Sequence, residues 1–319
     1  MTQKSADGRI RLTVLGGYLG SGKTTWLRHQ LFSGVFGDAH IIVNEAAETP
    51  VDDALLAEHA ESMTLLAGGC VCCTGKADLI AALRELCNTR SRQSASEPRL
   101  EQIVLETSGL ADPAAIVTAI REDPVLVYHI LVTEIIVAVD AANAIAQLSE
   151  EPLGRQQIEA ADRLLLTKVD TVTPESVSGL VGTLKVLNPA ATMSAAVKGI
   201  ELELEIDSDV PPVALPAFSG SDTRDPVVPM RIDIDPSVDW AAFSVWLSAL
   251  LHARGKDIVR VKGVLNSPAG HLLLQAVRNS VQSPEILPRS ASDHSNSIVF
   301  IGRGFTAAAL RSSLRHFVG

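Results

Sequence analysis

The feature that most constrains this 319-residue chain is a glycine-rich loop at residues 17–24, which reads GYLGSGKT. Residues 10–15 form a short apolar run that is typical of a buried strand, and residues 25–32 are predicted to be helical. The loop fits the phosphate-binding pattern G-x-x-x-x-G-K-[ST] in the strand–loop–helix context that this pattern requires. A glycine-rich turn that binds nothing is the alternative, and the agreement between pattern and context argues against it.

The residue types in this loop suit a nucleoside triphosphate. Glycines allow backbone N–H groups to turn toward phosphate oxygens, and the helix N-terminus adds a partial positive charge. Lys23 is expected to reach the β- and γ-phosphates, and the Thr24 hydroxyl is expected to ligate Mg²⁺. The predicted nucleotide-binding residues of the loop are Gly17, Gly20, Ser21, Gly22, Lys23, Thr24 and Thr25.

The apolar runs that follow predict a doubly wound α/β domain. They lie at residues 39–44, 103–106, 135–140 and 164–167, and they are continuously apolar, as in parallel strands that are covered on both faces. Predicted helices at residues 76–87, 113–120 and 174–187 fill the gaps between them. Ligands of such folds bind at the carboxyl ends of the strands, so the residues there are site candidates.

The segment TKVD at residues 167–170 resembles the base-reading N-K-x-D motif of GTPases. The Asp170 carboxylate would accept hydrogens from guanine N1 and N2, for which adenine has no equivalent. We expect Thr167, Lys168 and Asp170 to bind the base, with Thr167 in the place of the usual Asn. A helix-capping Asp beside a surface Lys is the alternative. Residues 188–199 are a candidate for a second loop on the base side.

The segment ETSG at residues 106–109 follows another predicted strand. Glu106 would hold Mg²⁺ through water or position the attacking water, and Gly109 would bring its backbone N–H to the γ-phosphate. A surface charge at a strand end is the alternative for Glu106. The predicted catalytic residues are therefore Lys23, Glu106 and Gly109.

Three of the four cysteines fall within four residues, at Cys70, Cys72 and Cys73. The sequence has no apolar signal region and no run of 18 apolar residues, so we expect a cytoplasmic location, no membrane span and reduced thiols. Thiolates favour Zn²⁺ and similar ions, and three closely spaced cysteines leave a coordination position open for ligand exchange. A redox pair and buried structural cysteines are the alternatives. Cys87 is interpreted as a core residue.

Composition divides the chain into two predicted domains. Residues 206–228 are rich in Pro, Ser, Asp and Gly and are interpreted as a linker between a phosphate-loop domain at 1–205 and an α+β domain at 229–319. In the second domain, the spacing of Trp240, Phe243 and Trp246 predicts a helix with a buried aromatic face. Strands are predicted at 257–265, 270–277 and 297–302, and a final helix at 306–317. The net charge of −10 argues against a broad nucleic-acid-binding surface.

These motifs together resemble those of the CobW-like branch of the CobW/HypB/UreG-related GTPases. The resemblance is carried by GGYLGSGKTT, VNEAAETPVD, GGCVCCT, LETSGLADP, TKVD and, near the C-terminus, GKDIVRVKGVL and SIVFIGRGF. It implies a P-loop NTPase domain with a smaller C-terminal domain, and GTP hydrolysis coupled to delivery of a transition metal to a client metalloprotein. It also implies that Cys70, Cys72 and Cys73 form a C-x-C-C metal motif. Zinc is the expected metal, with cobalt or nickel as alternatives.

Two departures from the family pattern affect these expectations. Ala46 and Ala47 stand where the family usually has Phe-Gly, although Glu45 and Glu48 on either side are kept and are further metal-binding candidates. Residues 201–226 contain no histidine, where many members carry a histidine-rich stretch.

Our hypothesis is that γ-phosphate contacts of Glu45, Glu48 and ETSG move the cysteine segment and change its metal affinity. The alternative functions are a cobalt or nickel insertase for one enzyme, a metal-sensing regulator with little turnover, and an ATP-using small-molecule kinase. A homodimer is an assembly that the sequence leaves open.

Overall fold

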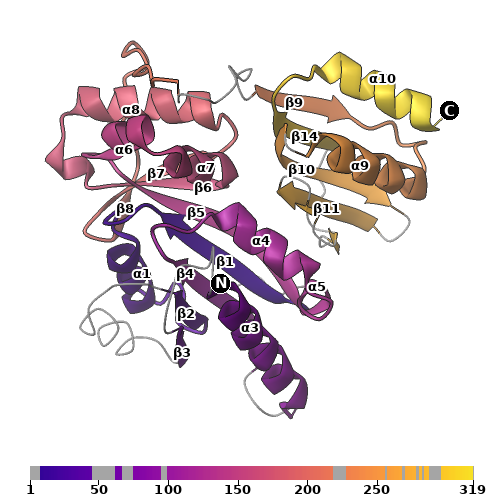
Figure 1. Cartoon of the computed structure of the whole chain (residues 1–319), viewed down its shortest axis with the longest axis horizontal. Helices are drawn as coiled ribbons and strands as arrows, with labels where there is room; N and C mark the ends of the chain where they lie inside the picture. The colour runs from indigo at the N-terminus through magenta and orange to yellow at the C-terminus, as the bar shows by residue number, and fades with distance from the viewer. Residues whose placement is uncertain are drawn as a thin grey trace. The chain divides into compact units, whose positions relative to one another are not determined.

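The computed structural model describes residues 8–44, 62–66, 75–94, 99–217, 228–255, 257–267, 270–277, 280–281, 284–286 and 296–318. The chain divides into two compact units, one spanning Arg9–Gly220 and one containing Ser221–Gly319 (Figure 1). The finer boundaries at 205, 206–228 and 229 stay a prediction. Within the described residues, no helix has the length and apolar character needed to cross a membrane.

The first unit is built on an eight-stranded sheet with the strand order β3-β2-β4-β1-β5-β6-β7-β8. All neighbouring strands are parallel except β7 and β8. This confirms the predicted doubly wound α/β class, and it places the carboxyl ends of β1, β4, β5 and β6 at one edge of the sheet. The strands are β1 (Ile10–Gly17), β2 (His40–Asn44), β3 (Ser62–Leu65), β4 (Gln102–Thr107), β5 (Ile130–Asp140), β6 (Arg163–Thr167), β7 (Thr192–Val197) and β8 (Ile200–Leu202).

Helices cover both faces of this sheet. Leu15 on β1 belongs to a core cluster with Trp26 and Leu27 of α1 on one face. The adjacent Gly16 points the other way, where a Cβ atom would lie 2.8 Å from Pro113 at the start of α4. The helices are α1 (Lys23–Phe32), α3 (Gly75–Arg92), α4 (Pro113–Glu122), α5 (Leu126–His129), α6 (Ala144–Glu150), α7 (Pro152–Ala160) and α8 (Pro174–Leu187), with a 3-10 turn η1 (Val169–Thr171).

After β8 the chain returns along α8 in an extended segment, residues 207–216, which we call the α8 strap. Backbone N–H of Asp207 donates to Ser178 Oγ at 3.0 Å, and N–H of Val213 donates to Thr183 Oγ1 at 2.8 Å. The glycine at position 182 allows the close approach, since a Cβ there would lie 3.1 Å from Pro212 Cα. Part of the segment interpreted as a linker is therefore packed on the first unit.

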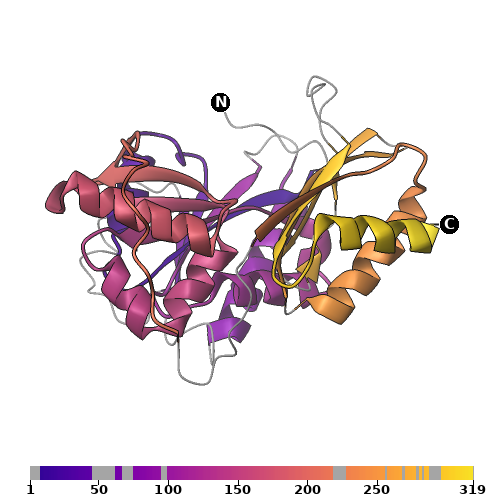
Figure 2. The ribbon, with the colours of Figure 1, turned by 90° about the horizontal axis from the view of Figure 1, so that it is seen from above.

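The second unit is an antiparallel sheet with the order β12-β11-β10-β14-β9, to which β13 adds beside β11. Its helices α9 and α10 lie together on one face of the sheet (Figure 2). The predicted aromatic face of α9 is core, because Phe243 and Trp246 are buried and Trp246 packs edge-on against Phe300. The elements are β9 (Val228–Asp233), α9 (Trp240–Arg254), β10 (Ile258–Ser267), β11 (Gly270–Val277), β12 (Ser280–Val281), β13 (Glu285–Ile286), β14 (Ser297–Gly302) and α10 (Ala307–Val318).

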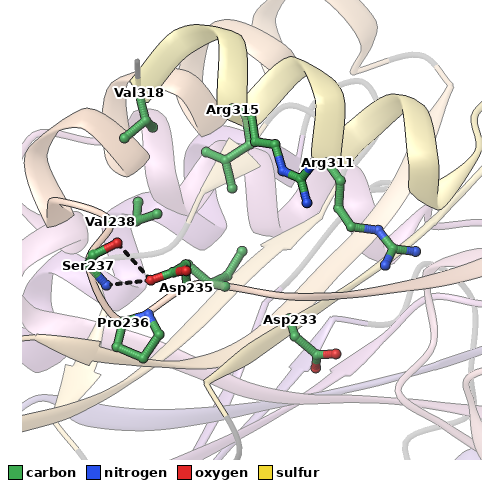
Figure 3. Close-up of a pocket in the computed structure, with 10 residues that line it drawn as sticks. Asp233, Asp235, Pro236, Ser237, Val238, Arg311, Arg315 and Val318 are labelled. Atoms are coloured by element: carbon green, nitrogen blue, oxygen red, sulfur yellow. Dashed lines mark hydrogen bonds between the residues drawn. The ribbon is translucent and has the colours of Figure 1, made fainter.

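A groove of about 740 Å³ lies in the second unit between α10 and the turn that follows β9 (Figure 3). Arg311 and Arg315 project along its α10 side, and Asp233 and Asp235 lie on the opposite side. The Asp235 carboxylate is hydrogen-bonded within its own turn. It accepts from the backbone N–H and the hydroxyl of Ser237 at 2.9 and 2.7 Å. These hydrogen bonds lower the pKa of the Asp235 carboxyl.

Candidate functional site

The glycine loop between β1 and α1 has a backbone shape that favours glycine. Gly20 and Gly22 have φ angles of 70° and 82°, in the left-handed region. Gly17 has φ 135°, and a Cβ atom there would lie 2.4 Å from the carbonyl oxygen of Ala138 on β5. The loop is therefore folded tightly against the end of the sheet, as the phosphate-binding pattern predicts.

The interior of this loop contains hydrogen-bond donors suited to an anion. Lys23 is only 3% exposed, and its Nζ donates to the carbonyl of Tyr18 at 3.3 Å across the loop. Ser21 Oγ is buried and has no hydrogen-bond partner within the described part of the chain. The α1 N-terminus begins at Lys23 without a side-chain cap, so its first backbone N–H groups remain available. Phosphate oxygens are acceptors that these donors would satisfy.

Thr24 and Glu106 meet at the predicted magnesium position. The Thr24 hydroxyl donates to Glu106 Oε1 at 2.6 Å, which leaves the hydroxyl lone pairs free for a cation. Glu106 is fully buried at the end of β4, so it is not a surface charge. Asn44 Nδ2, at the end of β2, is also buried without a partner among the described residues. The oxygen atoms present fit Mg²⁺, which prefers hydroxyl, carboxylate and water ligands.

The loop after β4 packs directly on the phosphate loop. A Cβ atom at Gly109 would lie 2.5 Å from the backbone nitrogen of Leu19, so only glycine fits at this contact. Gly109 is buried, whereas the next residue, Leu110, is 44% exposed. The structure thus brings Gly109 beside the loop in which Lys23 lies, as expected for a residue that contacts the γ-phosphate.

The TKVD residues line a cavity of about 210 Å³ beside the start of α1. Asp170 lies in the exposed turn η1 and contributes to the cavity wall. The Thr167 hydroxyl donates to the carbonyl of Ser21 at 2.8 Å, and Lys168 Nζ donates to the carbonyl of Gly20 at 2.8 Å. The cavity is also lined by Ala196 at the end of β7 and by Lys198 and Gly199 just after it. Most of the predicted base-side loop at 188–199 is therefore strand, and its last residues lie at the cavity.

Lys168 is held by a carboxylate at the end of β5. Its Nζ lies 2.7 Å from Asp140 Oδ2, and Asp140 also accepts from Asn143 Nδ2 and the backbone N–H of Ala142. Burial alone would raise the pKa of the Asp140 carboxyl, but these hydrogen bonds lower it below its ordinary value of 3.8. Asp140 therefore stays ionised and fixes the lysine that supports the phosphate loop.

The predicted metal ligands Cys70, Cys72, Cys73, Glu45 and Glu48 lie outside the described residues. Among the residues that are described, no group of three or more His, Cys, Asp or Glu side chains is arranged to hold a metal ion. The neighbouring parallel strands β2 and β3 lead into the two segments that carry these ligands. Cys87 is 2% exposed in α3, as expected for a core residue, and burial raises the pKa of its thiol to about 11.

Comparison with known families decides what kind of protein has this site. The model of the CobW/HypB/UreG nucleotide-binding domain matches residues 11–195, which is more than half of the chain. The chain belongs to the CobW/HypB/UreG family. The C-terminal domain of the cobalamin synthesis protein cobW matches residues 228–318. Both matches confirm the resemblance inferred from the motifs.

Relatives within this family cover nearly the whole chain. The zinc chaperone YjiA of Escherichia coli (strain K12) is 29% identical over 305 residues, which are 92% of this chain and 94% of YjiA. The zinc chaperone CobW of Pseudomonas aeruginosa is 28% identical over 352 residues, covering 96% of this chain and 91% of its own. A crystal structure of a zinc-bound triple mutant of the YjiA GTPase has a TM-score of 0.61 at 21% identity, covering 98% and 99% of the two chains. This last likeness concerns the fold.

Two further side chains hold residues of the site and are absent from the sequence predictions, namely Asp140 and Gln157. Asp140 carried a signal, because an acidic residue ends a buried apolar strand. Gln157 on α7 donates to the carbonyls of Gly109 and Ala111 and is 1% exposed. Its signal was a polar residue on the buried face of a short helix, beside Gly154 and Ile158.

Proposed function

We propose that this chain is a GTP-hydrolysing metallochaperone of the cytoplasm. It binds a transition metal, with zinc favoured, through Cys70, Cys72 and Cys73, and it delivers the metal to a client metalloprotein. The observation that carries the proposal is the convergence of the phosphate loop, Glu106 and Asp170 at one edge of the sheet. Family membership and relatives named as zinc chaperones and as a GTPase support it.

In this proposal, the nucleotide-binding residues form one group at the phosphates and one group at the base. Gly17, Gly20, Ser21, Gly22 and Thr25 belong to the loop that surrounds the phosphates, and Asp170 reads guanine from the cavity that Thr167 and Lys168 line. The hydroxyl and amide donors of the loop bind phosphate oxygens, and the Asp170 carboxylate accepts hydrogens from the guanine ring. The proposed base specificity is therefore GTP rather than ATP.

Hydrolysis would use Lys23, Glu106 and Gly109. Lys23 exchanges its bond to the Tyr18 carbonyl for a phosphate oxygen, and the Gly109 N–H stabilises charge on the γ-phosphate. Glu106 orients the Thr24 hydroxyl and water at the phosphate end of the site. Thr24, whose hydroxyl is fixed by Glu106, would hold Mg²⁺, and the ion would supply positive charge to the phosphate site.

The metal arm of the proposal rests on chain topology as well as on the cysteine spacing. The cysteine segment lies between β3 and α3, and the segment with Glu45 and Glu48 lies between β2 and β3. Asn44 at the end of β2 pairs in register with Thr107 of the ETSG motif on β4. Contacts with a γ-phosphate at this edge would therefore pull on the chain that leads toward the cysteines.

Cobalt is the alternative metal that an observation favours, because the C-terminal match is to a cobalamin synthesis protein. Thermal-shift titration of the reduced protein with Zn²⁺, Co²⁺ and Ni²⁺ distinguishes the metals. The largest stabilisation at the lowest concentration identifies the bound ion. We expect it from zinc, and a clear preference for Co²⁺ or Ni²⁺ would instead support an insertase for one enzyme.

The nucleotide arm is tested by binding and turnover. We expect GTP to bind more tightly than ATP and to be hydrolysed to GDP and phosphate. Lys23→Ala should abolish GTP binding, whereas Lys185→Ala, which removes an exposed lysine from α8, should leave it unchanged. GTP affinity retained in Lys23→Ala would contradict the phosphate-loop role. If the protein binds GTP but does not hydrolyse it in the presence of zinc, a metal-sensing regulator is favoured over a GTPase.

A further inference from the structure

A buried glutamine joins α7 to the loop that follows β4. Gln157 Nε2 donates to the carbonyl oxygen of Ala111 at 2.8 Å and to that of Gly109 at 3.2 Å. The amide nitrogen must face these atoms, because a carbonyl oxygen can only accept. The side chain is 1% exposed, so these carbonyls have no ready substitute in bulk water.

The helix that carries Gln157 is itself fixed. Asn188, at the end of α8, donates through Nδ2 to the carbonyls of Ile158 and Ala161 at 2.8 and 2.9 Å. These contacts tie down the last turn of α7, immediately after Gln157. The glutamine therefore holds the ETSG loop against a rigid support.

Gly109 is confined by contacts with two partners, Leu19 and Gln157. Its Cα packs on the backbone of Leu19 in the phosphate loop, and its carbonyl is held by Gln157. The following backbone N–H, of Leu110, points to Ser108 Oγ at 3.4 Å. The peptide plane after Gly109 is thus fixed. The plane before it, which carries the Gly109 N–H, is held as well, because the Ser108 carbonyl accepts from the backbone N–H of Ala111 at 3.0 Å, and Gln157 holds the Ala111 carbonyl in turn.

We infer that Gln157 is a positioning residue that sets the Gly109 N–H for the γ-phosphate and so makes the site distinguish GTP from GDP. The inference rests on the proposed function, since it requires that this site binds guanine nucleotides. Gln157 touches no nucleotide in this account and acts through the Gly109 backbone. GDP lacks the γ-phosphate, so its affinity does not depend on where that N–H points.

The experiment compares the affinities of GDP and of a non-hydrolysable GTP analogue, both with Mg²⁺, for the full chain and for Gln157→Met. Methionine keeps the length of the side chain but has no donor. We expect the analogue to bind about tenfold more weakly to the variant, with GDP affinity unchanged, because a buried carbonyl has lost its donor. The rate of GTP hydrolysis should fall in the same variant.

Thr183→Val is the matched control, because Thr183 is also buried and hydrogen-bonded to backbone groups but lies on α8 and serves the α8 strap. If Gln157→Met binds GDP and the analogue more weakly by the same factor, in line with its loss of thermal stability, Gln157 has only a structural role and the inference is wrong. Unchanged affinity for both would also overturn the inference. No binding of either nucleotide by the unmodified chain would instead contradict the proposed function.

Gln157→Glu keeps the inference testable if the methionine variant does not fold. Burial beside two carbonyl oxygens raises the pKa of a carboxyl placed there, and only its protonated form donates a hydrogen bond. The ratio of analogue to GDP affinity should therefore recover toward the unmodified value as pH falls, beyond any change in the unmodified chain. A ratio as low as that of Gln157→Met at every pH would contradict the role of a donor.

Discussion

At the residue scale, side chains around the phosphate loop act mainly on its backbone. Lys23 donates to the carbonyl of Tyr18, Lys168 to that of Gly20, and Thr167 to that of Ser21. These bonds hold the loop in a phosphate-binding shape before any ligand enters, which lowers the entropic cost of binding. Thr167 makes this contact with a hydroxyl where the usual motif has an amide.

The residue that should decide the base is Asp170. Asp170→Asn keeps the size of the side chain but replaces one acceptor oxygen by a donor, which faces a guanine donor. We expect the ratio of GTP to ATP affinity to fall about 10- to 100-fold, as for the loss of a charge-assisted hydrogen bond. Competition against a fluorescent guanine nucleotide measures this ratio, with Glu175→Gln on the exposed first turn of α8 as the charge-matched control. An unchanged preference for GTP would refute the role.

Asp140 should matter for stability in a pH-dependent way. Its pKa is lowered in the folded chain, so its stabilisation is fully present above the ordinary value of 3.8 and is lost as pH falls through the lowered value. Asp140→Asn should therefore cost about 1–2 kcal/mol from neutral pH down to about pH 4, and less below that. Urea unfolding at a series of pH values measures the difference, with Asp233→Asn, an exposed carboxylate of the second unit, as the control. A difference that grew as pH fell would contradict this account.

At the element scale, continuous apolar runs were the reliable signal. The strands predicted at residues 10–15, 103–106 and 164–167 became β1, β4 and β6, because burial on both faces needs apolar residues throughout. The sequence predicts no strand at β3, β7 or β8. β3 and β8 lie at the sheet edges and are largely exposed, and β7 has no continuous apolar run. β5 begins at Ile130, five residues before the predicted run, because Thr133 and Glu134 interrupt it.

The site was predictable where single motifs define it and not where distant elements meet. TKVD and ETSG are contiguous motifs, so each identifies its site residues directly from the sequence. The contact of Gln157 with Gly109 joins residues 48 positions apart and depends on how α7 packs, which no local pattern encodes. The sequence predicts a linker at the α8 strap for a similar reason, because its proline-rich composition says nothing about the residues of α8 on which it packs.

The α8 strap should depend on one hydroxyl. Thr183 Oγ1 accepts from the N–H of Val213 at 2.8 Å, and it lies 3.0 Å from the Val213 carbonyl and 2.9 Å from the Gly179 carbonyl of its own helix. Thr183→Val keeps the shape of the side chain and removes the contacts with Val213 as well as the one within α8, so we expect a loss of about 1–3 kcal/mol and faster proteolysis within residues 207–216. Thr118→Val is the control, because the Thr118 hydroxyl donates only within its own helix, to Ala114 at 2.9 Å. Equal effects of the two substitutions would show that the strap gains nothing from Thr183.

At the scale of the whole molecule, the nucleotide edge belongs to the same sheet as β2 and β3, the strands that the segments with the predicted metal ligands follow in the chain. β2 lies between β3 and β4, so the strand leading to the Glu45 segment is hydrogen-bonded both to the strand leading to the cysteines and to the strand leading to ETSG. If contacts with a γ-phosphate move the end of one of these strands, the hydrogen bonds between the strands can transmit that movement to the ends of the others. The account therefore predicts that nucleotide state sets metal affinity.

Titration of Zn²⁺ into the reduced protein tests this directly, once with Mg²⁺ and a non-hydrolysable GTP analogue and once with Mg²⁺ and GDP. A chromophoric chelator in competition reports the affinity, and Cys72→Ser shows whether the measured site is the cysteine segment. We expect the two zinc affinities to differ by about 5- to 150-fold, the usual range of coupling between two sites. Equal zinc affinities in the two nucleotide states would contradict the central claim.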